Sequence, residues 1–205
     1  IRPGDGFPDR ITPEGRSLVD VNYRKLEQVH ICLSARGLSI SDERRYTFSL
    51  LNTILGGNMS SRLFQEIREK RGLAYAVYSF IAAHVDTGMF GVYLGVDPKR
   101  AGETTELVLN EISKLKNKKV DSSELKGAKE YTKGSLLLSS ESTDNQMVRT
   151  AQNEIHFGRD IPLHYLHEKI ESVSREQIIE LAKYLFQNDQ MVLTILGPVN
   201  DKKVF

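Results

Sequence analysis

Cysteine and tryptophan are almost absent from this sequence. Its 205 residues include no tryptophan and one cysteine, Cys32. A single thiol excludes a disulfide within the chain and a zinc site built from several thiolates. Because Cys32 lies in an alternating run with Val29, Ile31 and Leu33, we expect a buried strand thiol and not a reactive nucleophile. This cysteine usage suits a reducing cytoplasm or an organelle interior, and of these we predict a cytoplasmic protein.

The sequence also lacks an excess of charge and a long apolar run. Lys and Arg number 28 and Asp and Glu 27, so the formal net charge is +1 with histidine neutral. A nucleic-acid surface needs a basic stripe. The basic cluster from Lys114 to Lys119 instead reads as a solvated helix end whose lysines complement the helix dipole. No apolar run approaches the ~18 residues of a membrane-spanning helix. We therefore predict neither a nucleic-acid nor a membrane partner.

What the sequence does contain is typical of a globular domain. Hydrophobic residues make up 40% and charged residues 27% of the chain, which allows one substantial core. Residues 1–16 are rich in glycine, proline and aspartate and are predicted to be an interdomain linker. Because the sequence starts at Ile1, we expect residues 17–205 to be one domain of a longer polypeptide.

Hydrophobic periodicity predicts the order of the elements. Residues 17–24 and 28–35 alternate and are expected to be two strands that pair with each other. Ser41-Asp42 is expected to cap an apolar helix that runs to Leu55. Residues 75–84 and 89–96 read as an antiparallel hairpin. The remaining elements are helices over 97–115, 121–140, 143–157, 162–170 and 174–186, followed by a strand over 190–197.

This order predicts the fold class. With a short helix over residues 60–71 it reads ββααββαααααβ, which is typical of an α+β fold. We expect a two-layer sandwich in which the helices pack on one face of a mainly antiparallel sheet. The continuous hydrophobicity of residues 190–197 favours a central strand that is buried on both faces.

The stretch from Leu55 to Phe80, LGGNMSSRLFQEIREKRGLAYAVYSF, contains patterns typical of a helix end, a helix start and a strand in close succession. The pair Gly56-Gly57 suits a helix end that needs a positive φ. Ser60 and Ser61 are good N-cap residues for the short helix that follows. After that helix, an alternating run predicts a strand. The stretch is therefore expected to form a helix–turn–strand corner.

Two side chains in this corner are the candidate site residues. Arg68 lies near the end of the short helix, and Tyr75 opens the strand, so both are expected at the same end of the sheet. An ordinary structural role is the alternative. In that case Arg68 would form an ion pair with Glu66 or Glu69 on a solvated surface, and Tyr75 would be an ordinary aromatic residue of the strand.

The same stretch resembles the signature of the C-terminal half of the insulinase (pitrilysin-type) zinc metallopeptidases. The similarity is to the branch that includes bacterial processing-protease-like proteins and mitochondrial processing peptidase. The segments DTGMFGVYLGVDP and ILGPV are also similar to that family, so the resemblance extends over nearly the whole chain. It implies that residues 17–205 are the non-zinc half-domain of a zinc metalloendopeptidase.

The resemblance also implies roles and partners. Arg68 and Tyr75 match an Arg…Tyr pair, seven residues apart, that the family's second half contributes for substrate binding and transition-state stabilisation. Zinc and the general base would belong to the absent N-terminal catalytic half, which becomes an expected partner together with the peptide substrate. A homodimer is a further partner that the resemblance leaves open. The chain alone is expected to be inactive.

One histidine pair within the chain needs separate consideration as a metal site. His164 and His167, followed by Glu168, stand in the order His-x-x-His-Glu, whereas the family's zinc motif is His-x-x-Glu-His. We therefore predict no metal site in this chain. The short Gly56-Gly57-Asn58-Met59 segment also differs from the long glycine-rich loop of the family's non-catalytic processing subunit. This favours a bacterial single-chain or homodimeric type.

A second function remains open from the sequence. The chain could be part of a non-catalytic interaction or assembly subunit of the same fold, as the core proteins of respiratory complexes are. An intact His-x-x-Glu-His motif in the preceding half of the full-length protein would indicate the enzyme, and a degenerate motif would indicate the assembly subunit.

Overall fold

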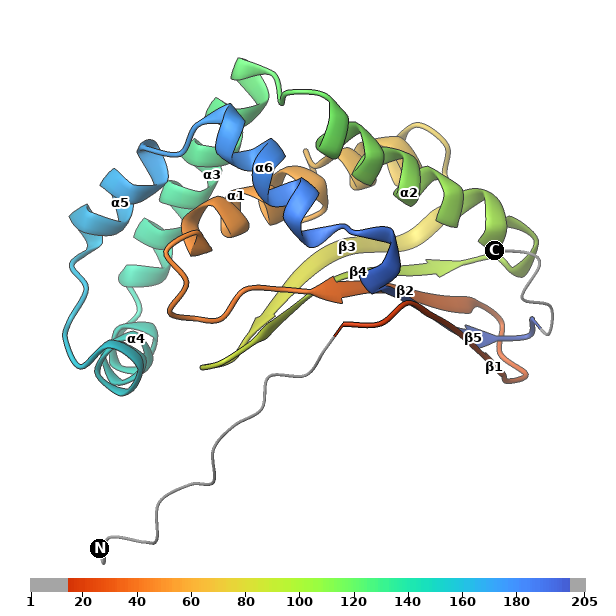
Figure 1. Ribbon diagram of the computed structural model, residues 1–205, viewed down its shortest axis with the longest axis horizontal. Coiled ribbons are helices and arrows are strands. Elements are labelled where there is room, and N and C mark those ends of the chain that lie inside the picture. The colour runs from red at the N-terminus through yellow and green to blue at the C-terminus, as the bar shows by residue number, and fades with distance from the viewer. Residues whose placement is uncertain (1–14, 200–205) are drawn as a thin grey trace, which may run out of the picture.

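The computed structural model describes residues 15–199 and shows a helical layer on one face of a twisted sheet (Figure 1). The strands are β1 (Leu18–Tyr23), β2 (Val29–Arg36), β3 (Ala74–Ala83), β4 (Gly88–Val96) and β5 (Met191–Gly197). The α-helices are α1 (Arg45–Leu55), α2 (Ala101–Asn117), α3 (Ser122–Ser140), α4 (Thr143–Phe157), α5 (Leu163–Glu171) and α6 (Arg175–Leu185). Shorter helices are η1 (Phe64–Glu69), η2 (Pro98–Arg100) and η3 (Asn188–Gln190).

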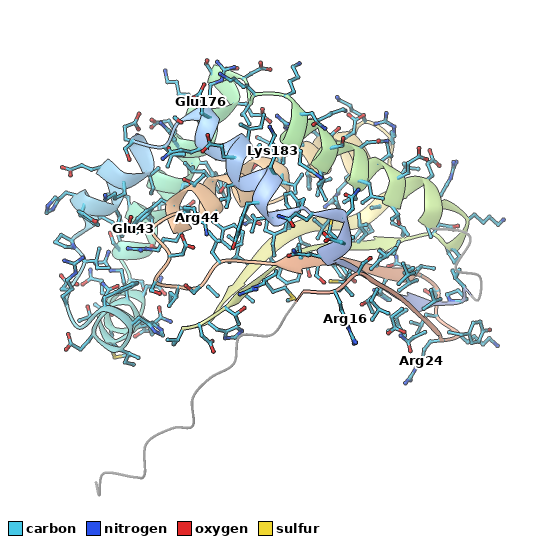
Figure 2. The ribbon with its side chains drawn as sticks, in the orientation of Figure 1. Arg16, Arg24, Glu43, Arg44, Glu176 and Lys183 are labelled. Carbon is cyan, nitrogen blue, oxygen red and sulfur yellow. The ribbon has the colours of Figure 1, made fainter. Side chains whose placement is uncertain are left out.

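The predicted fold class is confirmed. The strands form a sheet of order β1-β5-β2-β4-β3, in which β1 and β5 are parallel and the other neighbours are antiparallel. Charged side chains such as Glu176 and Lys183 lie on the helical layer, whereas Arg16 and Arg24 lie beside the sheet (Figure 2). The predicted linker falls almost wholly on residues 1–14, outside the described part. None of the helices in residues 15–199 is long and apolar enough to cross a membrane.

The predicted pairing of the first two strands is wrong. Strand β5 lies between them, parallel to β1 (Leu18↔Val192) and antiparallel to β2 (Cys32↔Thr194). The segment between β1 and β2 has no tight-turn residues, so it can cross over β5. Five of the six β1 residues are exposed, which suits an edge strand.

The central position predicted for the last strand is confirmed, but its burial on both faces is wrong. Leu193 and Ile195 are buried under the helices, whereas Val192, Thr194 and Leu196 are only half-buried. The reason is that the helices cover one face of the sheet, as Figure 1 shows. The other face of the sheet is not covered by any element of residues 15–199.

The core lies between the sheet and the helices. Alternate residues of β2 and β4 are buried against it, and the helices contribute a second set of aliphatic side chains. Burying each large aliphatic side chain stabilises the fold by about 1.5–3 kcal/mol relative to leaving it exposed. The largest fully buried side chains are Ile31, Leu50, Leu51, Leu55, Leu63, Ile67, Phe90, Leu94, Leu115, Ile178, Leu185 and Phe186.

Cys32 does not belong to this core. It alternates with Val29, Ile31 and Leu33 and therefore points to the uncovered face, where it is half-buried. Partial burial raises the pKa of the thiol above its ordinary value. The expected strand position of the thiol is confirmed, but its expected burial is wrong, because the apolar neighbours in the sequence occupy the opposite side of the strand.

Several predicted helix ends are confirmed. Asp97 accepts a hydrogen bond from the Lys99 amide ahead of Pro98, and Ser174 forms a capping box with Gln177. α4 ends at Gly158 with φ +61°. The predicted cap of the first helix is wrong. α1 has no side-chain cap, and Asp42 instead holds Arg44 through its amide and its guanidinium.

Candidate functional site

The candidate site is built on the junction between α1 and β3. The Ser79 amide donates to the Gly56 carbonyl at 3.1 Å, and the Ser79 hydroxyl donates to Asn52 Oδ1 at 2.7 Å. Gly56 itself has φ −157°, so the positive φ predicted for this helix end is wrong. Glycine is needed for another reason: a Cβ at Gly56 would lie 2.5 Å from the Ser79 nitrogen. This close approach fixes the end of α1 against β3.

The turn after α1 is organised by Asn58 and not by helix caps. Asn58 Oδ1 accepts from the Ser60 amide at 2.7 Å, and the Ser61 hydroxyl donates to the Asn58 carbonyl at 2.6 Å. Neither serine caps a helix, so their predicted role is wrong. Their side chains are instead used in the tight turn that starts the next element.

The short helix predicted over residues 60–71 is present, but most of it is a π-helix, whose turns are wider than those of an α-helix. This π-helix is η1, in which the Lys70 amide donates to the Gln65 carbonyl at 3.0 Å, five residues back. Such segments are rare and are frequent at functional sites. Arg62 anchors the start of this segment to α3 by a bidentate pair with Glu124, with both N–O distances 2.7 Å.

A β-bulge places Tyr75. Ala74 pairs with Val96 and Ala76 pairs with Gly95, so Tyr75 is an extra residue in β3. Regular alternation would have put Tyr75 on the same side as Val77. In the structure Tyr75 is 79% exposed, whereas Ala74 and Val77 are buried. The bulge therefore turns the phenol out of the core, which is how bulges beside active sites re-aim side chains.

Arg68 and Tyr75 lie together at this corner. The Arg68 guanidinium carbon is 5.6 Å from the centre of the Tyr75 ring and 4.9 Å from the centre of the Phe64 ring. The ion pair expected for an ordinary surface role is not formed, because Glu66 binds Lys70 at 3.0 Å and also binds Arg71. Hydrogen bonds from Lys70 and Arg71 lower the pKa of Glu66.

The result is an exposed cation beside an exposed phenol. Within residues 15–199, Arg68 has no carboxylate partner and contacts aromatic faces, which keep its hydrogen-bond donors available. The structure thus brings the two predicted site residues together at the start of β3, an edge strand of the sheet. Their roles in binding or catalysis stay predictions.

The uncovered sheet face carries a second polar group that sequence reasoning missed. His30 Nδ1 and the Tyr93 hydroxyl are 2.6 Å apart, and the rings of Tyr78 and Tyr93 are 5.1 Å apart. Burial, and then the neighbouring Tyr78, raise the pKa of Tyr93. Alternation along one strand cannot predict that neighbouring strands place these three rings side by side.

The described part of the chain does not offer zinc a ligand set. No group of three histidine, cysteine, aspartate or glutamate residues in the described part could hold a metal ion. His164 is exposed, whereas His167 is half-buried and its Nε2 has no hydrogen-bond partner. The two histidines of the His-x-x-His-Glu sequence therefore lie in different environments.

Comparisons with known proteins agree with the fold and the signature stretch. The family described as Peptidase M16 inactive domain matches residues 3–131. An uncharacterised zinc protease of Bacillus subtilis is 39% identical over 85% of this chain, which spans 42% of that protein. The crystal structure of a peptidase M16 inactive domain from Pseudomonas fluorescens has a TM-score of 0.82 at 25% identity, and covers 96% of this chain and 48% of that one.

A second solved structure shares the fold. A chain of complex III2 from Candida albicans has a TM-score of 0.79 at 18% identity and covers 98% of this chain and 51% of that one. The chain thus spans about half the length, or less, of the proteins it matches. The family match covers more than half of the sequence. These findings confirm the resemblance seen in the signature stretch, and the chain belongs to the peptidase M16 family as an inactive, C-terminal domain.

Proposed function

We propose that this chain is the substrate-binding half of a zinc-dependent endopeptidase and completes its active site. The observation that supports it most directly is the corner where Arg68 and Tyr75 meet, exposed and without a carboxylate partner for Arg68 in the described residues. The names of the relatives as zinc proteases point the same way. Alone, without the other half of the polypeptide, the chain is inactive in this proposal.

Each residue has a definite task in this proposal. Arg68 binds a carbonyl or carboxylate of the substrate, because a guanidinium presents several donors in a fixed plane. Tyr75 donates its hydroxyl hydrogen to the peptide or to the oxygen on which negative charge develops. Zinc bound by the other half of the protein would supply a Lewis acid. No described residue of this chain fits that metal.

The sheet edge suits an extended peptide substrate. β3 is one of the two edge strands of the sheet, and Tyr75 stands near its start. An extended peptide can add to such an edge through main-chain hydrogen bonds. We infer that the peptide lies along β3 and reaches the Arg68–Tyr75 corner. Cleavage of presequence-like segments, a cytoplasmic location and a homodimer belong to the same proposal.

Substitutions at the corner test the proposal in the full-length protein. Tyr75→Phe should lower kcat by about 10²-fold, the usual cost of losing one oxyanion donor. Arg68→Ala should lower kcat/KM, because Arg68 binds the substrate. The zinc content should not change, because neither residue is a ligand. Tyr23→Phe and Arg24→Ala are matched controls at the opposite edge of the sheet and should leave turnover unchanged. Normal turnover in both corner variants would contradict the proposal.

A second candidate function is a non-catalytic assembly subunit. The observation that supports this second candidate is the fold similarity to a chain of complex III2 from Candida albicans. The sequence of the preceding half decides between the two, since hydrolysis needs an intact His-x-x-Glu-His motif there. If that motif is degenerate, the corner variants should affect complex assembly and leave no peptidase activity to measure.

A further inference from the structure

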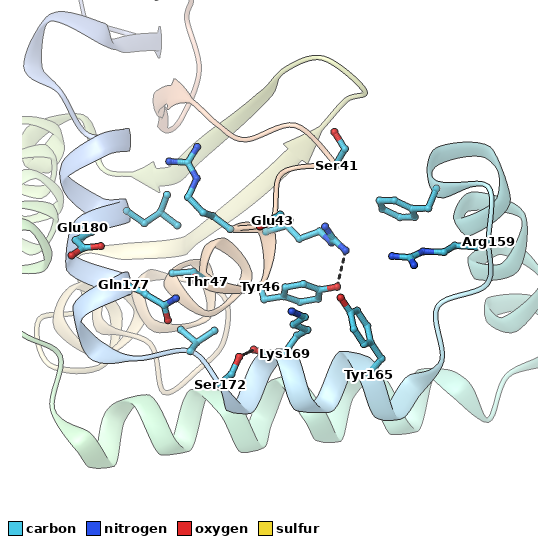
Figure 3. Close-up of a pocket in the computed structure, with 15 residues that line it drawn as sticks. Ser41, Glu43, Tyr46, Thr47, Arg159, Tyr165, Lys169, Ser172, Gln177 and Glu180 are labelled. Atoms are coloured by element: carbon cyan, nitrogen blue, oxygen red, sulfur yellow. Dashed lines mark hydrogen bonds between the residues drawn. The ribbon is translucent and has the colours of Figure 1, made fainter.

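A pocket of about 570 Å³ opens at the other end of α1 from the Arg68–Tyr75 corner. It lies where the N-terminal turn of α1 meets α5, α6 and the segment between α4 and α5 (Figure 3). Its size is within the range of about 300–1,000 Å³ that is typical of small-molecule sites. The proposed peptidase function makes no use of it.

The charged side chains of the pocket are mostly cationic. Arg44, Arg45, Arg159 and Lys169 line it together with the acidic residues Glu43 and Glu180. Arg44 is already neutralised, because its Nη2 lies 2.8 Å from Asp42 Oδ2. The other three cations form no salt bridge with any residue in the range 15–199. Glu180 lies at the far end of the pocket from Arg159 (Figure 3).

Arg45 is held in place by neutral groups. Its Nη2 donates to the Tyr46 hydroxyl at 2.7 Å, and its Nη1 donates to the Asp42 carbonyl at 3.3 Å. The guanidinium carbon is 4.5 Å from the centre of the Tyr46 ring and 5.0 Å from that of Phe157. A half-buried guanidinium that is fixed by aromatic faces and neutral acceptors keeps its charge free for an anion.

The remaining polar groups point toward the same place. Figure 3 shows the side chains of Tyr46, Arg159, Tyr165 and Lys169 converging at one end of the pocket. Lys169 Nζ lies 5.3 Å from the centre of the Tyr165 ring. The N-terminal turn of α1 contributes residues to the lining and contains no acidic residue, so the positive end of its dipole adds to the field.

We propose that this pocket binds a small phosphate-bearing anion. Arg45, Arg159 and Lys169 supply three positive charges, and the hydroxyls of Tyr46 and Tyr165 supply further donors. A phosphate dianion has more charge and more acceptor oxygens than a carboxylate, so it matches this set better. Phe157 and the remaining volume leave room for an organic group attached to the phosphate.

Calorimetry on the 205-residue chain tests the assignment. Inorganic phosphate, adenosine monophosphate and acetate are titrated separately at the same ionic strength in chloride buffer. Both phosphates should bind with one site per chain, and acetate should bind at least about tenfold more weakly. If adenosine monophosphate binds more tightly than inorganic phosphate, the ligand is an organic phosphate. If the two bind equally, the ligand is free phosphate. Absence of phosphate binding, or acetate binding as tightly, would overturn the proposal.

Charge-neutralising variants locate the binding. Arg159→Gln and Lys169→Gln change exposed side chains and should weaken phosphate binding about tenfold each, since hydrogen bonds to charged groups are the strong ones. Arg24→Gln and Lys183→Gln are exposed controls outside the pocket lining and should bind as the unsubstituted chain does. Unweakened binding in both pocket variants, or equal weakening in the controls, would show that the anion binds elsewhere.

Discussion

At the scale of single residues, Gly56 shows how a correct emphasis can rest on the wrong reason. The sequence pattern marked the glycine as important for a positive φ, but φ is −157°. Glycine is required because β3 packs closely against this position: a Cβ on residue 56 would lie 2.5 Å from the Ser79 nitrogen. A single sequence contains no signal for a contact between segments 23 positions apart. Asp42 is similar, because it was expected to cap α1 and instead binds Arg44.

Gly56→Ala should therefore destabilise the chain. The added methyl group meets backbone that cannot move without shifting β3, and such overpacking costs about 1–3 kcal/mol. The free energy of unfolding in urea measures the effect. Gly127→Ala is the matched control, because a Cβ there meets nothing within 4 Å and the residue lies in α3. That control should stabilise the chain by about 0.5–1 kcal/mol. A Gly56→Ala chain as stable as the original would contradict the steric account.

At the scale of elements, period and capping signals predicted where most helices and strands lie, and Thr143–Phe157 matches its predicted bounds. The two irregular elements were not predicted. η1 is a π-helix and Tyr75 is a bulge residue, and each adds one residue to a regular pattern. Propensity gives no warning of such insertions. Both lie beside the candidate site, which is where irregular backbone is most often found.

The Arg62–Glu124 pair should hold η1 against α3. The two side chains are 18% and 29% exposed and make two bonds of 2.7 Å. A double-mutant cycle with alanine should give a coupling free energy of about 1–2 kcal/mol, as expected for partly buried charged hydrogen bonds. The exposed Arg100–Glu103 pair, at 58% and 48% exposure, is the control and should give about 0.3–0.5 kcal/mol. Equal coupling in the two pairs would mean that η1 is not anchored this way.

At the scale of the whole molecule, the layers were predictable and the strand order was not. Amphipathic helices and alternating strands indicated a two-layer α+β sandwich, which the structure shows. The insertion of β5 between β1 and β2 depends on how distant parts of the chain pack, and local patterns do not contain that information. The uncovered sheet face is also a property of the whole molecule. It carries His30, Cys32 and Tyr93.

Cys32 can report on what covers this face. Because burial raises its pKa above the ordinary 9.0, alkylation of the chain by iodoacetamide should keep accelerating at pH values where an ordinary thiol has levelled off. The chain spans 42% of its Bacillus subtilis relative, and we expect the rest of such a protein to cover the sheet. Alkylation should then be slower in the full-length protein than in this chain. The same two proteins in denaturant are the control and should react equally. Identical rates under native conditions would contradict the expectation.

The place of β5 has a consequence for how the protein is made. A ribosome delivers the chain from its N-terminus, so β2 emerges more than 150 residues before the strand that pairs with it from His30↔Leu196 to Ala35↔Met191. Until Gly197 is released, one side of β2 exposes unpaired amides and carbonyls that other chains can join. A nascent or truncated chain ending before Met191 should therefore need a chaperone to stay monomeric, whereas in a chain that extends through Gly197 the pairing with β5 covers that side of β2.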